Sequence, residues 1–243
     1  MVTDNTMAIL APMPQVTVPA ETLLQFGEQW TANGEKLSRS LPFSSSQLGT
    51  QFDQAIGSAL ATMLGGIPVV APLNSNALVA PQADCVEVGE TRTIGGVRPQ
   101  NFDVCYRPDG IRFVSDSKTL NDRESVRKNY QNMINDLATE ATTIHVRFPY
   151  AVVAFIVIVP APCLLQPQRA ALIGTLDRLA RRTSTNNQSH LAEAISLVVW
   201  QPETGEISPD VPAIGSRLRL EMFSSAIQSA YFSRYEGLPP HTI

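Results

Sequence analysis

The sequence predicts an α/β fold in which helices flank a mixed central sheet. Residues 101–120 read NFDVCYRPDGIRFVSDSKTL and contain two β-rich runs on either side of Arg-Pro-Asp-Gly. Proline presets φ and glycine accepts positive φ, so this pattern is typical of an antiparallel hairpin. Further along, apolar runs at 150–159 and 195–200 enclose a helical pattern at 168–182. A strand, a helix and a strand at this spacing predict a right-handed crossover between parallel strands.

Length and composition favour a single folded domain over residues 1–243. Of the 243 residues, 44% are hydrophobic and 16% are charged, which is typical of a globular chain and not of a disordered one. We expect a mainly helical part over 1–80, a core over 84–200 and a closing helix over 214–236. The start of the chain lacks the pattern of a signal peptide, and the run 151–159 is too short to span a bilayer, so we expect a cytoplasmic protein with no membrane contact.

The three cysteines do not suggest a metal site. Cys85, Cys105 and Cys163 are odd in number and lack the spacing of metal ligands. We therefore expect free, buried thiols of the kind found in a reducing compartment.

The elements before the hairpin are predicted mainly from helical periodicity. Residues 1–20 are expected to form an irregular arm, and 21–38 a helix that Asn33-Gly34 interrupts. A clear helix is predicted over 47–64, where apolar residues recur every three or four positions and Gly65-Gly66 follow. After a packed connection over 67–81, we expect a first strand at 85–88 and a loop over 89–100.

The elements after the hairpin alternate between helices and strands. Asn121-Asp122 can cap a helix that runs to about residue 142, after which His145 is expected at the entrance to a strand in a structural role. The runs 150–159 and 195–200 carry apolar residues on both alternating faces, which predicts strands buried on both faces. The helix 168–182 lies between them, and a closing helix over 218–235 precedes the tail 237–243.

The candidate functional residues lie on the central hairpin. Asp103 is on its first strand, and Asp116, Ser117 and Lys118 end its second strand. Residues two apart in a strand share a face, so Asp116 and Lys118 project together. If paired positions sum to 219, Asp103 lies opposite Asp116, whereas pairs that sum to 218 place the two aspartates on opposite faces. The sequence leaves both registers open.

Two carboxylates beside an ammonium suit a hydrolytic magnesium site. Mg²⁺ prefers oxygen ligands and usually takes only one or two carboxylates. Such an ion can polarise a phosphoryl oxygen and acidify a bound water, and a lysine can orient that water or offset developing charge. Lys118 is one of only 3 lysines in a chain with 15 arginines, so a titratable cation is placed where arginine could not replace it.

The arrangement of Asp103, twelve intervening residues and then Asp116-Ser117-Lys118 resembles the signature of the PD-(D/E)XK nuclease superfamily. The resemblance covers the order of elements from about Asp84 to Trp200, and Phe102 stands where the family name has proline. It implies a restriction-endonuclease-like core and a Mg²⁺-dependent endonuclease that hydrolyses DNA, of the type II-like restriction or defence kind. By the same resemblance, Asp103, Asp116 and the Ser117 carbonyl would bind the metal, Lys118 would assist the attacking water, and the enzyme would act on DNA as a homodimer.

The resemblance also leaves several points open. A helix before the sheet often supplies a further acidic ligand in the family, and Asp53 or Glu28 could do so, although each alone reads as an exposed carboxylate. The net charge is −4, but Arg123, Arg127 and Lys128 follow the motif closely and could contribute to a local positive field. The alternatives are a non-catalytic nucleic-acid-binding or scaffold protein that retains the fold, and a nuclease acting on RNA or branched DNA.

Overall fold

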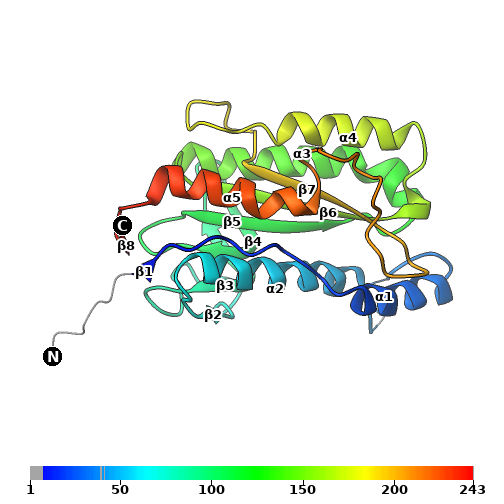
Figure 1. Ribbon diagram of the computed structural model, residues 1–243, viewed down its shortest axis with the longest axis horizontal. Coiled ribbons are helices and arrows are strands. Elements are labelled where there is room, and N and C mark those ends of the chain that lie inside the picture. The colour runs from blue at the N-terminus through cyan, green and yellow to red at the C-terminus, as the bar shows by residue number, and fades with distance from the viewer. Residues whose placement is uncertain (1–7, 39, 41, 243) are drawn as a thin grey trace.

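A computed structural model describes residues 8–38, 40 and 42–242. Within them the chain forms an α/β fold around a mixed six-stranded sheet with the strand order β2-β3-β4-β5-β6-β7 (Figure 1). The strands of this sheet are β2 (Val69–Val70), β3 (Val86–Ile94), β4 (Pro99–Tyr106), β5 (Phe113–Thr119), β6 (Val152–Pro160) and β7 (Ala194–Trp200). The helices are α1 (Ala20–Ala32), α2 (Ser45–Met63), α3 (Arg123–Arg147), α4 (Gln168–Leu179) and α5 (Leu220–Tyr235). In Figure 1, α3 and α4 lie above the sheet, and α1 and α2 lie below it.

The parallel crossover is confirmed. Strand β6 pairs in parallel with β5 on one side and with β7 on the other, with Phe155 opposite Asp116 and Ile195. Every residue of β6 and of β7 is buried. The continuous apolar runs predicted this result, because a strand covered on both faces has no polar side.

The hairpin adopts the register in which Asp103 and Asp116 are opposed. Val104 pairs with Ser115 and Tyr106 with Phe113, so paired positions sum to 219. The connection between the two strands is not a tight two-residue turn but spans residues 107–112. Inside it, Arg112 donates its backbone N–H to the Tyr106 carbonyl at 3.0 Å and binds the Asp109 carboxylate.

The predicted loop over 89–100 is wrong, because most of it belongs to a second hairpin. Strand β3 continues to Ile94, and β4 begins at Pro99. Gly89 has φ of +129°, and the register between β3 and β4 shifts between Val88 and Thr91. A glycine that relieves a β-bulge keeps the strand going, whereas in the sequence the same glycine resembles a break.

The third helix also departs from its predicted end. It continues from Arg123 to Arg147, about a turn past the predicted residue 142, so His145 lies on a helix and not at the start of a strand. The Asp122 side chain caps this helix by accepting a hydrogen bond from the Ser125 N–H at 2.8 Å, as the sequence suggested.

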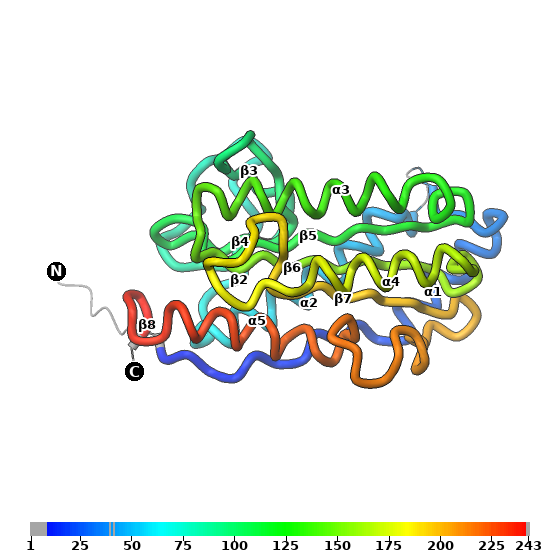
Figure 2. The backbone as a smooth tube through the Cα atoms, turned by 90° about the horizontal axis from the view of Figure 1, so that it is seen from above, coloured from blue at the N-terminus to red at the C-terminus, as the bar shows by residue number. Residues whose placement is uncertain are grey.

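Two short strands near the ends of the described part of the chain were not predicted. Strand β1 (Ala8–Ile9) pairs in parallel with β8 (His241–Thr242) in a separate two-stranded sheet. Figure 2 shows the N-terminal segment running beside α5, and Met13 donates its backbone N–H to the Gln228 side chain at 2.7 Å. This segment has no regular secondary structure over residues 10–19, as predicted, and it packs on the closing helix.

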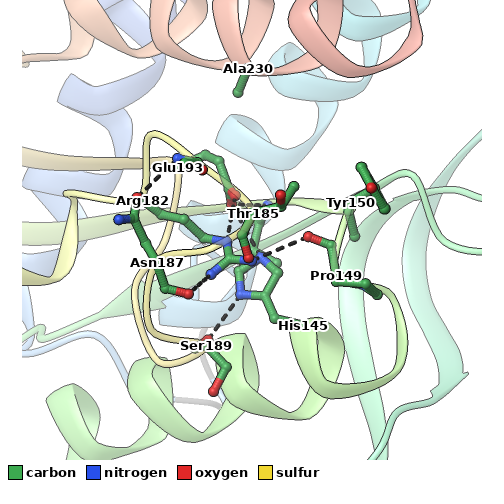
Figure 3. A network of polar contacts seen from close by, with 12 residues as sticks. His145, Pro149, Tyr150, Arg182, Thr185, Asn187, Ser189, Glu193 and Ala230 are labelled. Atoms are coloured by element: carbon green, nitrogen blue, oxygen red, sulfur yellow. Dashed lines mark hydrogen bonds and ion pairs between the residues drawn. The ribbon is translucent and has the colours of Figure 1, made fainter.

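A network of buried charges joins the N-terminal ends of β6 and β7 to the surrounding helices (Figure 3). The Glu193 carboxylate lies 3.0 Å from Arg182 Nε, 2.8 Å from Arg234 Nη2 and 3.3 Å from His145 Nε2. Glu193 Oε2 also accepts the backbone N–H of Val153 at 2.8 Å. His145 therefore has a structural role, as predicted, and the Arg182 side chain is buried beside it.

Two smaller expectations concern the cysteines and membrane-spanning helices. Cys85, Cys105 and Cys163 are all free and buried, as predicted. None of the helices in the described part of the chain is long and apolar enough to cross a membrane.

Candidate functional site

The candidate site forms where β4 and β5 separate. Their backbone pairing runs from Tyr106–Phe113 to Val104–Ser115. Beyond this point β4 remains paired with β3, and β5 remains paired with β6 as far as Thr119. The Ser117 N–H is directed to the Asp103 carboxylate, with an N to Oδ2 distance of 3.2 Å. A side chain thus takes the place of a backbone acceptor, and the diverging strands open a space between them.

Lys118 is held by carboxylates from two elements. Its ammonium donates to Asp116, which precedes it by two residues on the same face of β5, and to Glu140 Oε1 of α3 at 2.9 Å. Asp116 is 7% exposed and Glu140 is 3% exposed, so both carboxyl groups are buried. The predicted proximity of Asp116 and Lys118 is therefore present, and Glu140 joins them from the helix that covers this face.

The opposite face of β5 carries a second polar contact. Ser117 points to α2, where its hydroxyl donates to Asp53 Oδ1 at 2.6 Å. Gly49, one turn earlier on α2, packs on Ser117, and an added Cβ would be in ordinary van der Waals contact with the Ser117 Cβ at 3.5 Å. Helix α2 approaches the sheet most closely at β3, where a Cβ added to Gly57 would lie 2.2 Å from Val88 Cγ2. Asp53 is consequently 5% exposed, and the expectation of an exposed carboxylate is wrong for it.

These groups border a cleft of about 500 Å³ between α2, β5 and α3. Asp53, Asp103, Ser117 and Lys118 line it, whereas Asp116 and Glu140 contact Lys118 from the protein interior. The rest of its lining is mainly polar and comes from α2, the end of β5 and α3. These further lining residues are Ser45, Ser46, Gly49, Thr50, Thr119, Leu120, Asn129, Asn132, Met133 and Asp136.

Three carboxyl groups of the site hold their protons unusually tightly. Burial, the shared hydrogen bond with Asp116 and the charges of Asp116 and Asp53 raise the pKa of Asp103 to about 9. Burial raises the pKa of Asp53 to about 7, although the Ser117 hydroxyl opposes this shift. Burial and the Asp116 charge likewise raise the pKa of Glu140 to about 8. Perturbed carboxyls gathered at a cleft are typical of functional sites.

Nearby charges outweigh burial at Lys118, so its ammonium remains charged. Burial alone would lower the pKa of its ammonium, but the Asp116 and Glu140 carboxylates outweigh burial and raise it. The site therefore combines one fixed cation with three carboxyl groups whose pKa values are raised. A divalent cation bound beside them would favour their ionised forms.

The donor set suits a hard divalent cation in its chemistry, although the side chains are turned to protein partners. Asp53, Asp103, Asp116 and the Ser117 carbonyl offer only oxygen atoms, which Mg²⁺ prefers. Among the described residues, no group of three or more His, Cys, Asp or Glu side chains is arranged to hold a metal ion. This agrees with the contacts above, since Asp116 is directed to Lys118 and Asp53 to Ser117.

Sequence reasoning named most of this constellation but missed Glu140. Glu140 follows Met133 and Leu137 on the buried line of α3, so a charged residue at that position was the available signal. The other proposed acid, Glu28, is exposed on α1 and is outside the cleft lining. Of the basic residues after the motif, Arg123 is paired with Glu35 and Lys128 with Glu124, while Arg127 is exposed on α3.

Comparisons with protein-family models, with curated proteins and with solved structures found no match to this chain. The function therefore has to be argued from the site itself.

The raised pKa values predict how stability changes with pH. An unfolded aspartate ionises near pH 4, but the folded protein keeps Asp103 protonated to about pH 9. Between these limits the folded state binds more protons, so its stability falls as pH rises. We expect the melting temperature without metal to decrease from pH 5 to pH 9, and Asp103→Asn to reduce that decrease. At pH 8 this variant should melt about 2–4 °C above wild type, the shift expected when the free energy of unfolding increases by about 1 kcal/mol.

Circular dichroism melts at pH 5, 7 and 9 would measure this effect. Glu203→Gln is a suitable control because Glu203 is exposed and lies outside the cleft. A melting temperature that changes by the same amount from pH 5 to pH 9 in wild type and in Asp103→Asn would contradict the assignment of a proton to Asp103.

Proposed function

We propose that this protein is a Mg²⁺-dependent endonuclease that hydrolyses phosphodiester bonds in DNA, of the type II-like restriction or defence kind. The observation that carries the proposal is the placement of Asp103, Asp116 and Lys118 at the point where β4 and β5 separate. This placement matches the resemblance to the PD-(D/E)XK superfamily in the three residues that define it. The mixed sheet, with its antiparallel hairpin followed by parallel strands, is compatible with a restriction-endonuclease-like core.

In this proposal each residue has a distinct task. Asp103, Asp116 and the Ser117 carbonyl hold the metal, and Asp53 is a further acidic group at the same cleft. A bound Mg²⁺ would polarise the scissile phosphate and acidify a water. The Lys118 ammonium orients the attacking water and stabilises charge that develops on the phosphate. Exclusion of bulk water from a buried cluster strengthens each of these electrostatic effects.

The polymer substrate would lie along the cleft between α2 and α3. Backbone amides and polar side chains supply many contacts to phosphate and sugar groups in known complexes, and Ser45, Thr50, Asn129 and Asn132 border the cleft. Exposed Arg127 lies in the N-terminal half of α3, next to these asparagines in sequence. A single site cuts one strand at a time, so paired cuts in both strands would favour a symmetric homodimer.

The direct test is incubation of purified protein with supercoiled plasmid DNA in Mg²⁺ or EDTA, followed by sequencing of the ends. We expect nicked or linear products only with Mg²⁺, with 5′-phosphate and 3′-hydroxyl ends as the resemblance implies. Parallel reactions with RNA and with branched DNA would distinguish the substrate classes.

A non-catalytic nucleic-acid-binding protein is the second candidate. The observation that favours it is the engagement of Asp116 by Lys118, together with the lack of a ready three-carboxylate metal cluster in the described residues. Binding of DNA with equal affinity in Mg²⁺ and EDTA, and without cleavage of any of the three substrates, would support this candidate over the nuclease.

A further inference from the structure

Lys118 has two carboxylate partners that differ in their relation to the cleft. Asp116 lies on the same strand and also neighbours Asp103, so it belongs to the proposed metal-binding group. Glu140 lies on α3, is almost completely buried and does not line the cleft. Its Oε1 accepts from the Lys118 ammonium at 2.9 Å. Asp116 is thus both a partner of Lys118 and a proposed metal ligand, whereas Glu140 is only a partner of Lys118.

Glu140 is itself held in place. Gln100 of β4 donates its side-chain amide to the same Oε1 atom at 3.1 Å. The helix around Glu140 is anchored by Leu137 and Ala141, which are buried in the hydrophobic core. A buried carboxylate is costly unless it is paired with donors, and here the donors come from two neighbouring strands. Oε1 is therefore a fixed acceptor close to the open end of the β4–β5 hairpin.

We propose that Glu140 is a positioning residue that holds the Lys118 ammonium at the cleft, so that the place of the ammonium does not depend on Asp116 alone. The role of Glu140 rests on the proposed nuclease function. A catalytic group must be held closely by residues whose own positions are fixed. Asp116 cannot supply this constraint by itself, because the same carboxylate has a second task beside Asp103.

A double-mutant cycle separates this role from a general structural one. We expect Glu140→Ala to lower the single-turnover rate of DNA cleavage about 10–100-fold, as loss of a transition-state interaction does, with DNA affinity in Ca²⁺ unchanged. Glu140→Gln keeps an acceptor for Lys118 and should lose less. In a Lys118→Met background, Glu140→Ala should cause no further loss, because both changes remove the same interaction. Effects of the two changes that multiply would overturn the proposal.

Glu124→Gln is the matched control. Glu124 lies on the same helix and pairs with Lys128, but both side chains are exposed and lie outside the cleft lining. This variant should cleave DNA at the wild-type rate. Urea unfolding of every variant establishes that the rates compare folded proteins.

A second measurement needs no cleavage at all. The chain has only 3 lysines, so the ¹⁵N-labelled side-chain ammonium groups can be assigned by NMR, with Lys118→Met identifying the Lys118 signal. In metal-free protein we expect a slowly exchanging Lys118 signal that is retained in Glu124→Gln and lost in Glu140→Ala. A Lys118 signal unchanged by Glu140→Ala would overturn the positioning role. Wild-type protein that shows the expected signals but cuts no nucleic acid would instead contradict the nuclease function and leave the contact between Glu140 and Lys118 established.

Discussion

Replacement of Asp116 or Lys118 is expected to reduce DNA cleavage by at least about 10²-fold, the size of effect seen when one preorganised electrostatic group is removed. Asp116→Asn removes a charge from the proposed metal-binding group but keeps the shape of the side chain. Lys118→Met removes the only ammonium that lines the cleft in the described residues, while it preserves most of the buried stem. These changes are preferable to alanine because Asp116 is buried.

The cause of the loss can be assigned by measuring binding separately. DNA affinity in Ca²⁺ should largely persist in both variants, because most of the proposed phosphate contacts would come from other residues along the cleft. Asp116→Asn should also weaken the stabilisation that Mg²⁺ gives to the folded protein, which amounts to about 2.7 kcal/mol at a hundred-fold excess over Kd. Lys118→Met should leave that stabilisation in place.

Lys36→Met is the control for the lysine variant. Lys36 is exposed and lies outside the cleft lining, so its loss should change the cleavage rate by less than about a factor of two, within the range of surface substitutions. If Asp116→Asn and Lys118→Met both cut DNA at the wild-type rate, the nuclease site is not where we propose. The nucleic-acid-binding alternative would then be preferred.

The parts of the fold that the sequence predicted are those in which local pattern and burial agree. Residues of β6 are apolar on both alternating faces, and such a run is compatible only with an interior strand or a buried helix. The cap at Asp122 and the stop at Gly65-Gly66 are likewise local signals with a local cause. The hairpin register was not determined by such signals, because the geometry of the connection over 107–112 decides it.

The features that the sequence did not predict depend on contacts between distant residues. Strand β3 continues past Gly89 because its pairing with β4 accommodates a bulge there. Local sequence propensity does not reveal this pairing. Glu140 is 22 residues from Lys118, and only the packing of α3 over β5 brings the two together. The site residues on the hairpin could be predicted from the sequence, because spacing in a strand determines which residues share a face. The acidic residues on helices could be proposed, but the sequence offered no means of ranking them. The sequence did not distinguish Asp53 from Glu28 as a further acidic ligand, but in the structure Asp53 is buried and Glu28 is exposed.

The buried Glu193 network should be the most sensitive point for stability. Its carboxylate faces two guanidinium groups and His145 at the N-terminal ends of β6 and β7 (Figure 3). Burial would raise the pKa of Glu193, but hydrogen bonding from His145 and the charges of His145 and Arg234 lower it, so the group is ionised at neutral pH. Glu193→Ala would leave buried cations without their counter-ion, and we expect a loss of about 3–5 kcal/mol in the free energy of unfolding.

A loss of this size is a large share of the total stability of a typical domain, about 5–15 kcal/mol. Urea unfolding followed by circular dichroism would measure it, with Glu203→Ala at an exposed position as the control that should stay within about 0.5 kcal/mol of wild type. Glu193→Gln should lose less than Glu193→Ala, because its amide oxygen can still accept the Val153 N–H. Where Glu193→Ala remains folded, its cleavage rate should match wild type, since Glu193 is outside the lining of the candidate cleft. A stability equal to that of wild type would mean that the cations are solvated in solution, and a folded variant without activity would place this network in the function and not only in the fold.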